Sequence, residues 1–200
     1  MAAGDSTVSI CNASLIALGE WPIAALTDNV KSAILCAARY DAGRRSVPSS
    51  CPRDCATAQA QIAASASVPK FQYSSAYPLP ADFLRLIRLP DEENNLNDWV
   101  VQNGAAYSSP AGVVLTDGTS PLNVLYVMDL RDETAFDPIL CELIAAELAV
   151  VLCMPLTQSV DKLNIARGER ERLRAIAQLV NSQENSPREW STDVVLRARR

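Results

Sequence analysis

The chain has 200 residues, of which 48% are hydrophobic, and a formal net charge of -5. This length suits one domain with a proper core, or one domain with a small insert, and the apolar content argues against wholesale disorder. Because phosphate contacts supply most of the affinity for duplex DNA, the acidic balance argues against a generic duplex-binding surface. No apolar run reaches the ~18 residues of a membrane span, and the N-terminus lacks a secretory signal pattern, so we expect synthesis in the cytosol.

Three helices are expected before residue 69. The first follows a cap signal at Asp5 and Ser6 and stops at Gly19. The second, over residues 28–45, is capped by Asp28, and Pro48 and Pro52 break the pattern after it. A third, alanine-rich helix is expected over residues 51–66. The predicted apolar stripes of the first two helices contain Val8, Cys11, Leu15, Ile16, Leu18, Val30, Ala33, Ile34, Ala37 and Tyr40.

After Pro69 the pattern changes to short segments typical of β-strands. They are separated by polar, turn-forming residues, including Asn-Gly and Asp-Gly pairs. The last of them, LNVLYVMDL, is the strongest strand prediction because it is β-branched, aromatic and of the usual length. The predicted strands, which we expect to form a small antiparallel sheet, are 84–89, 98–104, 111–120 and 122–130.

Two further helices are expected after the sheet. Asp132 or Asp137 caps a long apolar helix over residues 136–154, in which Pro138 occupies the first turn and Pro155 marks the end. A last helix, over residues 159–183, starts at Ser159 or Asp161 and is supported by Leu163, Ile165, Ala166, Leu173, Ile176 and Leu179.

This order of elements predicts an α+β fold. Residues 1–69 and 132–185 are expected to form a helical bundle, residues 70–131 an inserted β-region, and residues 186–200 an extended C-terminal tail. The stretch FQYSSAYPLPADFLRLIRL, residues 71–89, is interpreted as the joint at which the bundle gives way to the sheet. Its prolines hold the chain extended and its aromatic side chains are expected to pack the two parts together. The residues of this joint are Tyr73, Tyr77, Pro78, Pro80 and Phe83.

The residue types of common active sites are missing from the sequence. It contains no histidine, so a Ser–His–Asp or Cys–His site cannot form. No Walker A loop occurs. Cys51 and Cys55 form a C-x3-C pair, and a zinc site would need four ligands at suitable spacing. We therefore predict no catalytic residues, no metal site and no cofactor.

One acidic group leaves an alternative open. Asp91, Glu92, Glu93 and Asp98 lie in a polar connection that is interpreted as a solvated loop. Asp91, Glu92 and Asp98 could instead bind a divalent cation in a small metal-dependent nuclease. Another alternative is an α+β module that binds other proteins and does not assemble with its own copies into a closed ring.

The segment from Trp190 to Arg200 is apolar and basic in an otherwise acidic chain. It is either a frayed terminus or a peptide that docks in a groove of a partner or adds a strand to the edge of a sheet.

Three blocks of the sequence resemble the tail tubular, or head-to-tail adaptor, proteins of short-tailed bacteriophages. The first is SICNASLIALGEWPIAALTDNVKSAILCAARYDAGRR. Its opening CNASLIALG resembles the pattern CN-x-ALIxLG, with Ser14 in place of the alanine, and it closes with a C-x3-YD-x2-R pattern. The second is the joint, with its Y-x3-YPLPxDFLR core. The third is FDPILCELIAAELAVVLCMPLTQSVDKLNIARGERERLRAIAQ. One departure is that SSCPRDCATAQAQIAAS stands where relatives usually have an aromatic-bearing W-x-FA helix.

The resemblance implies a structural, non-enzymatic protein of the virion neck that is assembled in the host cytoplasm. Such adaptors form a homo-oligomeric ring, commonly dodecameric, beneath the portal protein. The ring receives the tail nozzle or tube, and DNA passes through its lumen without sequence-specific binding; no membrane is involved. The tail is expected to bind the portal through Trp190, Val194, Val195, Leu196, Arg197, Arg199 and Arg200. The loops expected to contact the nozzle or a neighbouring subunit contain Asp91, Glu92, Glu93, Asp98 and Asp117.

Overall fold

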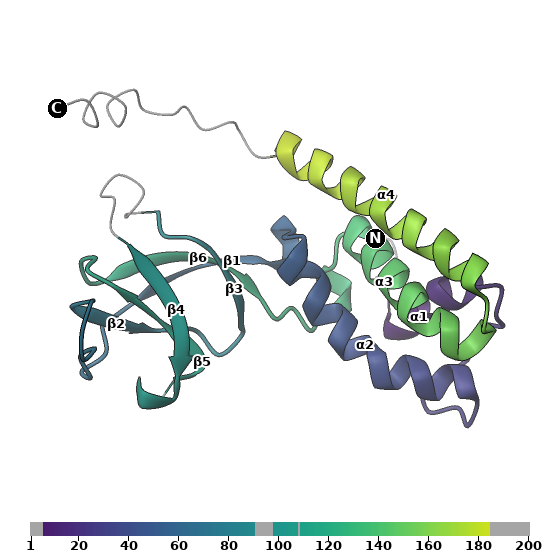
Figure 1. Cartoon of the computed structure of the whole chain (residues 1–200), viewed down its shortest axis with the longest axis horizontal. Coiled ribbons are helices and arrows are strands. Elements are labelled where there is room, and N and C mark those ends of the chain that lie inside the picture. The colour runs from purple at the N-terminus through teal and green to yellow at the C-terminus, as the bar shows by residue number, and fades with distance from the viewer. Residues whose placement is uncertain (1–5, 91–97, 108, 185–200) are drawn as a thin grey trace. The chain divides into compact units, whose positions relative to one another are not determined.

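The computed structural model describes residues 6–90, 98–107 and 109–184. The fold is α+β, as predicted, with four α-helices and two small antiparallel sheets in the described part of the chain. Figure 1 shows the elements in chain order. They are α1 (Thr7–Ala17), α2 (Lys31–Ser50), β1 (Thr57–Ile62), β2 (Ser75–Pro78), β3 (Phe83–Arg88), β4 (Trp99–Gly104), β5 (Ser109–Thr116), β6 (Leu122–Met128), α3 (Pro138–Thr157) and α4 (Val160–Glu184). Short 3-10 turns occur at Asp54–Ala56, Ala105–Tyr107 and Glu133–Ala135.

The chain divides into two compact units. The helical unit contains described residues 6–56 and 130–184, and the β unit contains described residues 57–129. The β-region is therefore inserted into the helical unit, as predicted, but it begins at residue 57 instead of residue 70. The predicted tail, residues 186–200, lies outside the described residues.

Local capping explains where three of the helices begin. The Ser6 hydroxyl accepts a hydrogen bond from the Ser9 amide at 3.2 Å, which completes a capping box at the start of α1. Asp137 caps α3 by accepting from the Leu140 amide at 2.6 Å, and Pro138 occupies the first turn as predicted. At α4, the Ser159 hydroxyl accepts from the Lys162 amide at 3.3 Å.

Helix α2 differs from its prediction at both ends. Its N-cap residue is Val30, because the Asp28 carboxylate instead accepts from the amides of Ala24 and Ala25 in the preceding loop. The helix also continues through Pro48 to Ser50. Both Val47 and Pro48 are buried, so packing of this turn offsets the cost of a proline inside a helix.

The predicted third helix does not form. Residues 54–56 make a 3-10 turn, and residues 57–62 form β1, which pairs with β6 in unbroken register from Thr57↔Val127 to Ile62↔Leu122. Side chains alternate along a strand, and Ala58, Ala60 and Ile62 pack toward the core while Gln59 and Gln61 are exposed. Pairing with β6 therefore overrides the helix propensity of the alanines.

The β unit contains two three-stranded sheets, with strand orders β1-β6-β3 and β2-β5-β4. Each of the four predicted strands corresponds to an observed one, although β5 begins at Ser109 and ends at Thr116. Both sheets contribute side chains to one apolar core. Its buried members are Tyr77, Leu79, Leu86, Leu89, Val114, Leu122, Val124 and Tyr126.

Helix α3 is the centre of the helical unit, because α1, α2 and α4 all pack against it. It continues past Pro155 to Thr157 and so has 20 residues. Its most apolar 18 residues have a mean hydropathy of 2.2, so the helix is long and apolar enough to cross a membrane by length and composition. This corrects the expectation that no apolar segment is that long. Since half of the most apolar window is buried against the other helices, the role of α3 as a core helix explains its composition.

Several residues predicted to lie on buried stripes point outward instead. On α1, Cys11, Leu15 and Leu18 are buried, but Ile16 is exposed. On α2 the buried side is formed by Ala33, Cys36, Tyr40 and Val47. The predicted stripe residues Val30, Ile34, Ile165, Ile176 and Leu179 are exposed. The helical unit thus has more apolar surface than its amphipathic patterns predict.

Candidate functional site

Most of the residues predicted to contact partners lie outside the described residues. This applies to Asp91, Glu92 and Glu93, and to every tail residue predicted to bind the portal: Trp190, Val194, Val195, Leu196, Arg197, Arg199 and Arg200. The nuclease alternative depends on the same acidic segment, of which only Asp98 is described; it is exposed and directly precedes β4.

The loop that follows β5 is held at its base by the predicted joint. The exposed Asp117 carboxylate accepts a hydrogen bond from the Ser74 amide at 2.7 Å. The hydroxyl of Tyr77, which is fully buried, donates to the Gly118 carbonyl oxygen at 2.7 Å. These two bonds position the loop from Thr116 to Pro121, which was predicted to meet the nozzle or a neighbouring subunit.

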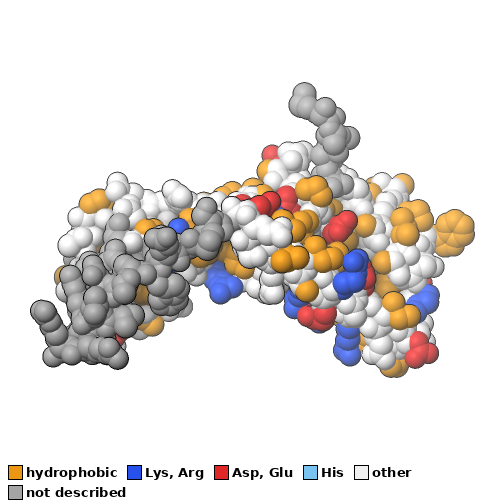
Figure 2. Space-filling view, turned by 90° about the horizontal axis from the view of Figure 1, so that it is seen from above, with side chains coloured by type: hydrophobic (Ala, Val, Ile, Leu, Met, Phe, Trp, Pro, Cys, Tyr) orange, Lys and Arg blue, Asp and Glu red, His pale blue; other side chains and the backbone are white. Residues whose placement is uncertain are grey.

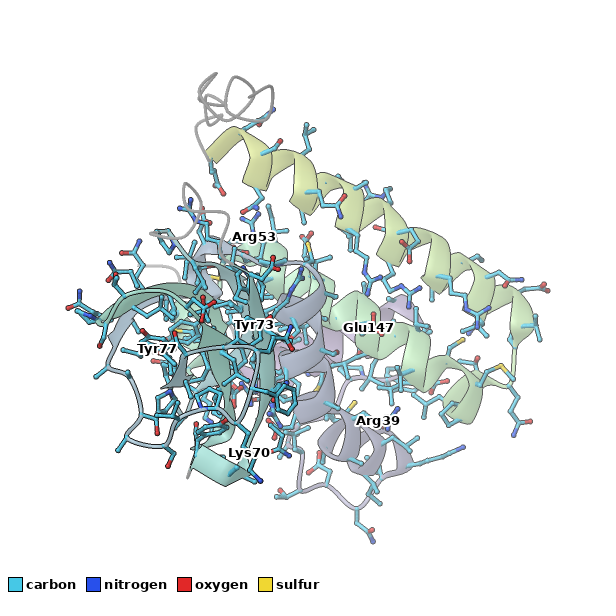
Figure 3. The ribbon with its side chains drawn as sticks, turned by 60° about the vertical axis from the view of Figure 1, so that its left-hand side comes forward. Arg39, Arg53, Lys70, Tyr73, Tyr77 and Glu147 are labelled. Atoms are coloured by element: carbon cyan, nitrogen blue, oxygen red, sulfur yellow. The ribbon has the colours of Figure 1, made fainter. Side chains whose placement is uncertain are left out.

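Figure 3 shows Tyr73 and Tyr77 among the strands of the β unit, and the other joint residues also make contacts within this unit. Tyr73 packs against a small cluster on β2 and β5, and Pro78 is the last residue of β2. The Pro80 carbonyl accepts from the Phe83 amide at 3.1 Å, which forms the turn into β3. The ring of Phe83 lies 6.0 Å from that of Tyr126. The structure therefore places the joint inside the β unit, while its predicted role in packing the sheet against the bundle stays a prediction.

Asp82, in the turn before β3, is hydrogen-bonded to a side chain of β6. Its carboxylate accepts a hydrogen bond from the Tyr126 hydroxyl at 3.1 Å. Burial, together with this hydrogen bond to a carboxylate, raises the pKa of Tyr126 to about 12. The phenol therefore stays protonated and serves as a structural hydrogen-bond donor.

We expect Tyr77→Phe to destabilise the β unit by about 1–3 kcal/mol, because the buried Gly118 carbonyl loses its donor. Denaturant unfolding measures the loss, and hydrogen exchange is expected to quicken in peptides that contain residues 116–121. Tyr73→Phe is the matched control, since the Tyr73 hydroxyl takes part only in a 3.5 Å surface contact with Gln72. Equal stability of the two variants would contradict the anchoring role of Tyr77.

A buried arginine that the sequence analysis did not identify organises the helical unit. The Arg53 side chain is 4% exposed and its Nε donates to the Asp137 carboxylate at 2.8 Å. Its guanidinium also donates to the Ala177 carbonyl at 3.2 Å and pairs with Glu184 at 3.5 Å. Burial alone would lower the pKa of Arg53, but the hydrogen bond and charge of Asp137 more than reverse this and raise it. Arg53 thus joins the start of α3 to the C-terminal half of α4.

The thiols near Arg53 are poorly suited to chemistry. Burial raises the pKa of both Cys51 and Cys55 above the usual value for a thiol, so each stays protonated at neutral pH. Within the described ranges, no cluster of three or more histidine, cysteine, aspartate or glutamate side chains is arranged to hold a metal ion. This neighbourhood is best described as a structural site.

Helices α1, α3 and α4 surround an apolar hollow in the helical unit. This groove, of about 560 Å³, has a floor formed by Glu142, Ala145, Ala146 and Ala149 of α3. Ala13 of α1 lies on one wall and Ile165 of α4, which is 72% exposed, lies on the other. We call it the α1–α3–α4 groove. Sequence reasoning missed it, because it depends on how three helices separated in the chain pack together.

Comparison with protein-family models gives no match for this chain, and comparison with curated proteins gives no significant match. The resemblance to head-to-tail adaptors therefore depends on the three sequence blocks alone.

Proposed function

We propose that this chain is a structural head-to-tail adaptor of a short-tailed bacteriophage. Its copies form a ring beneath the portal, the ring joins the portal to the tail nozzle, and DNA passes through the centre. The proposal draws on the three colinear blocks, which together span most of residues 6–180.

The observation that supports this proposal best is the apolar surface of the helical unit. Large apolar side chains stand exposed on α1, α2, α4 and the α1–α2 loop, where Trp21 is 88% exposed. Figure 2 shows apolar side chains at the molecular surface among charged ones. Exposed apolar side chains that gather over several elements favour a protein that associates with others. The residues concerned are Ile16, Trp21, Val30, Ile34, Ile165 and Leu179.

In this proposal the predicted contact residues keep the roles implied by the resemblance. Residues 186–200 reach the portal. The loop containing Asp117, which is held by Ser74 and Tyr77, presents a fixed surface to the nozzle or to a neighbouring subunit. A fixed loop loses less conformational entropy on binding than a mobile one, which favours this use.

Co-sedimentation with portal-bearing, tailless capsids tests the proposal. We expect the full chain to pellet with the particles, and a chain lacking residues 187–200 to stay in solution. A chain in which residues 187–200 are scrambled controls for composition and should also stay in solution. Failure of the full chain to bind would contradict the adaptor function, whereas equal binding by the deletion would contradict only the role of the tail.

A further inference from the structure

A second surface of the helical unit matches the α1–α3–α4 groove in shape. On α2, Ile34, Ala38 and Ala42 recur every four residues and are exposed, with Ile34 55% exposed. The buried side chains of α2, which include Ala33, Cys36 and Tyr40, lie on the opposite side of the helix. These three outward residues form a convex apolar strip, which we call the α2 ridge.

The groove and the ridge face different directions. α2 packs closely on α3, since a Cβ added to Gly43 would lie 3.5 Å from Cδ2 of Leu148. On an ideal helix Leu148 stands ~120° around the axis from Glu142, which lines the groove. The ridge is on the outer side of α2, away from this contact. A single chain therefore cannot fill its own groove with its own ridge.

The dimensions of the two surfaces agree. At 1.5 Å per residue, the ridge from Ile34 to Ala42 is ~12 Å long. The floor of the groove from Glu142 to Ala149 is ~10 Å long by the same measure. Alanines form most of the floor, so the backbone of an incoming helix can approach α3 closely. An apolar helix face laid in an apolar groove is a common mode of recognition.

Charge identifies the occupant. Glu142 stands exposed at the groove, and the nearby cation Arg172 is already hydrogen-bonded to Glu169 at 2.6 and 2.9 Å. Arg39 is exposed on the flank of the ridge (Figure 3) and forms no ion pair within the described part of the chain. The groove thus carries two carboxylates, Glu142 and Glu169, beside the guanidinium of Arg172, whereas the ridge carries Arg39, which has no ion pair among the described residues. The two are complementary only between different copies of the chain.

We propose that the α2 ridge of one copy occupies the α1–α3–α4 groove of the next copy, with Arg39 of one beside Glu142 of the other. The contact joins two different surfaces, so it is heterologous and propagates from copy to copy until the rotation closes a ring. This inference rests on the proposed ring function and identifies the surfaces that build the ring.

Two blocking variants test the head-to-tail geometry. Ala13→Arg places a long charged side chain over the groove, and Ile34→Glu places a charge on the ridge; both positions are exposed, so the fold should persist. In sedimentation velocity experiments we expect the unmodified chain to self-associate and each variant alone to stay monomeric. Mixed in equal amounts, the variants retain one intact groove and one intact ridge, so they should form dimers and nothing larger. Val68→Glu, at an exposed site of the β unit outside both surfaces, should associate normally.

A charge exchange tests the pairing of Arg39 with Glu142. Arg39→Glu and Glu142→Arg each bring like charges together, and we expect each to weaken self-association at least about tenfold, equivalent to 1.4 kcal/mol. The double variant restores opposite charges at every contact and should recover association.

Three outcomes would overturn the inference: an unmodified chain that stays monomeric up to about 1 mM, which sets self-association weaker than -4.1 kcal/mol; blocking variants that associate normally; or mixed variants that do not pair. Capsid co-sedimentation tests the adaptor function separately. If the chain binds portal particles but gives any of these three results, the ridge-in-groove contact is contradicted and the adaptor function is not.

Discussion

Arg53→Met is expected to lower the free energy of unfolding of the helical unit by about 3–5 kcal/mol, the usual cost of removing one partner of a buried ion pair. The substitution leaves the Asp137 carboxylate without the guanidinium that donates to it at 2.8 Å. It also removes the donor to the Ala177 carbonyl, so α4 loses a link to the segment between α2 and β1. Denaturant unfolding followed by the circular dichroism of the helices measures the loss. Arg39→Met is the matched control and should change stability by less than about 0.5 kcal/mol, since Arg39 is exposed.

A double-mutant cycle separates the ion pair from the general effects of the substitution. Asp137→Asn removes the charge but keeps a side chain that caps helices well, so the start of α3 is preserved. We expect a coupling energy between the two substitutions in the 0.5–3 kcal/mol range, roughly that of directly interacting residues. Additive effects would contradict the role assigned to Arg53.

Leu148→Ala is expected to destabilise the helical unit by about 2–5 kcal/mol, because it creates a cavity between α2 and α3. Leu148 is 1% exposed and lies against Gly43, where the two helices approach closely. Leu179→Ala deletes the same atoms from a side chain that is 59% exposed, and it should change stability by less than about 0.5 kcal/mol. The midpoint of chemical unfolding compares the two variants. A loss for Leu148→Ala no larger than that for Leu179→Ala would mean that α3 is not the core of the unit.

Elements with strong local signals were predicted well from the sequence. The sequence offered two residues for each of three helix starts, and the observed caps of α1, α3 and α4 are one of each pair: Ser6, Asp137 and Ser159. Caps can be predicted in this way because capping involves residues three or four apart. The strand LNVLYVMDL became β6, the central strand of its sheet. In each case residues close together in the sequence were sufficient to predict the element.

The failures have a common physical origin in contacts between residues far apart in the chain. The sequence of β1 has the composition of an alanine-rich helix, but the segment forms a strand because it pairs with β6. The helix was predicted to stop before Pro48, yet α2 continues through Pro48, because burial keeps that turn helical. Ile34 and Ile165 fit helical apolar stripes, yet both are exposed, because the packing of α3 decides which side of each helix is buried.

The candidate surfaces were harder still to predict. The groove depends on the distance between α1 and α4 where both pack on α3. The apolar periodicity of each helix does not predict this distance. The sequence contains one indication of the Arg53 site, which is an arginine between Cys51 and Cys55 in a segment with few charges. If such a cation is buried, it needs a carboxylate nearby, because an unpaired buried charge is costly. Most of the predicted contact residues, namely those at 91–93 of the acidic loop and those of the tail, lie outside the described residues.

Electron microscopy of the chain mixed with portal-bearing, tailless capsids tests the central claim most directly. The account predicts a closed ring of this chain stacked beneath the portal, with the centre open for DNA, and an Ile34→Glu variant that forms no closed ring. Capsids that carry no additional density at the portal after incubation with the full chain would contradict it.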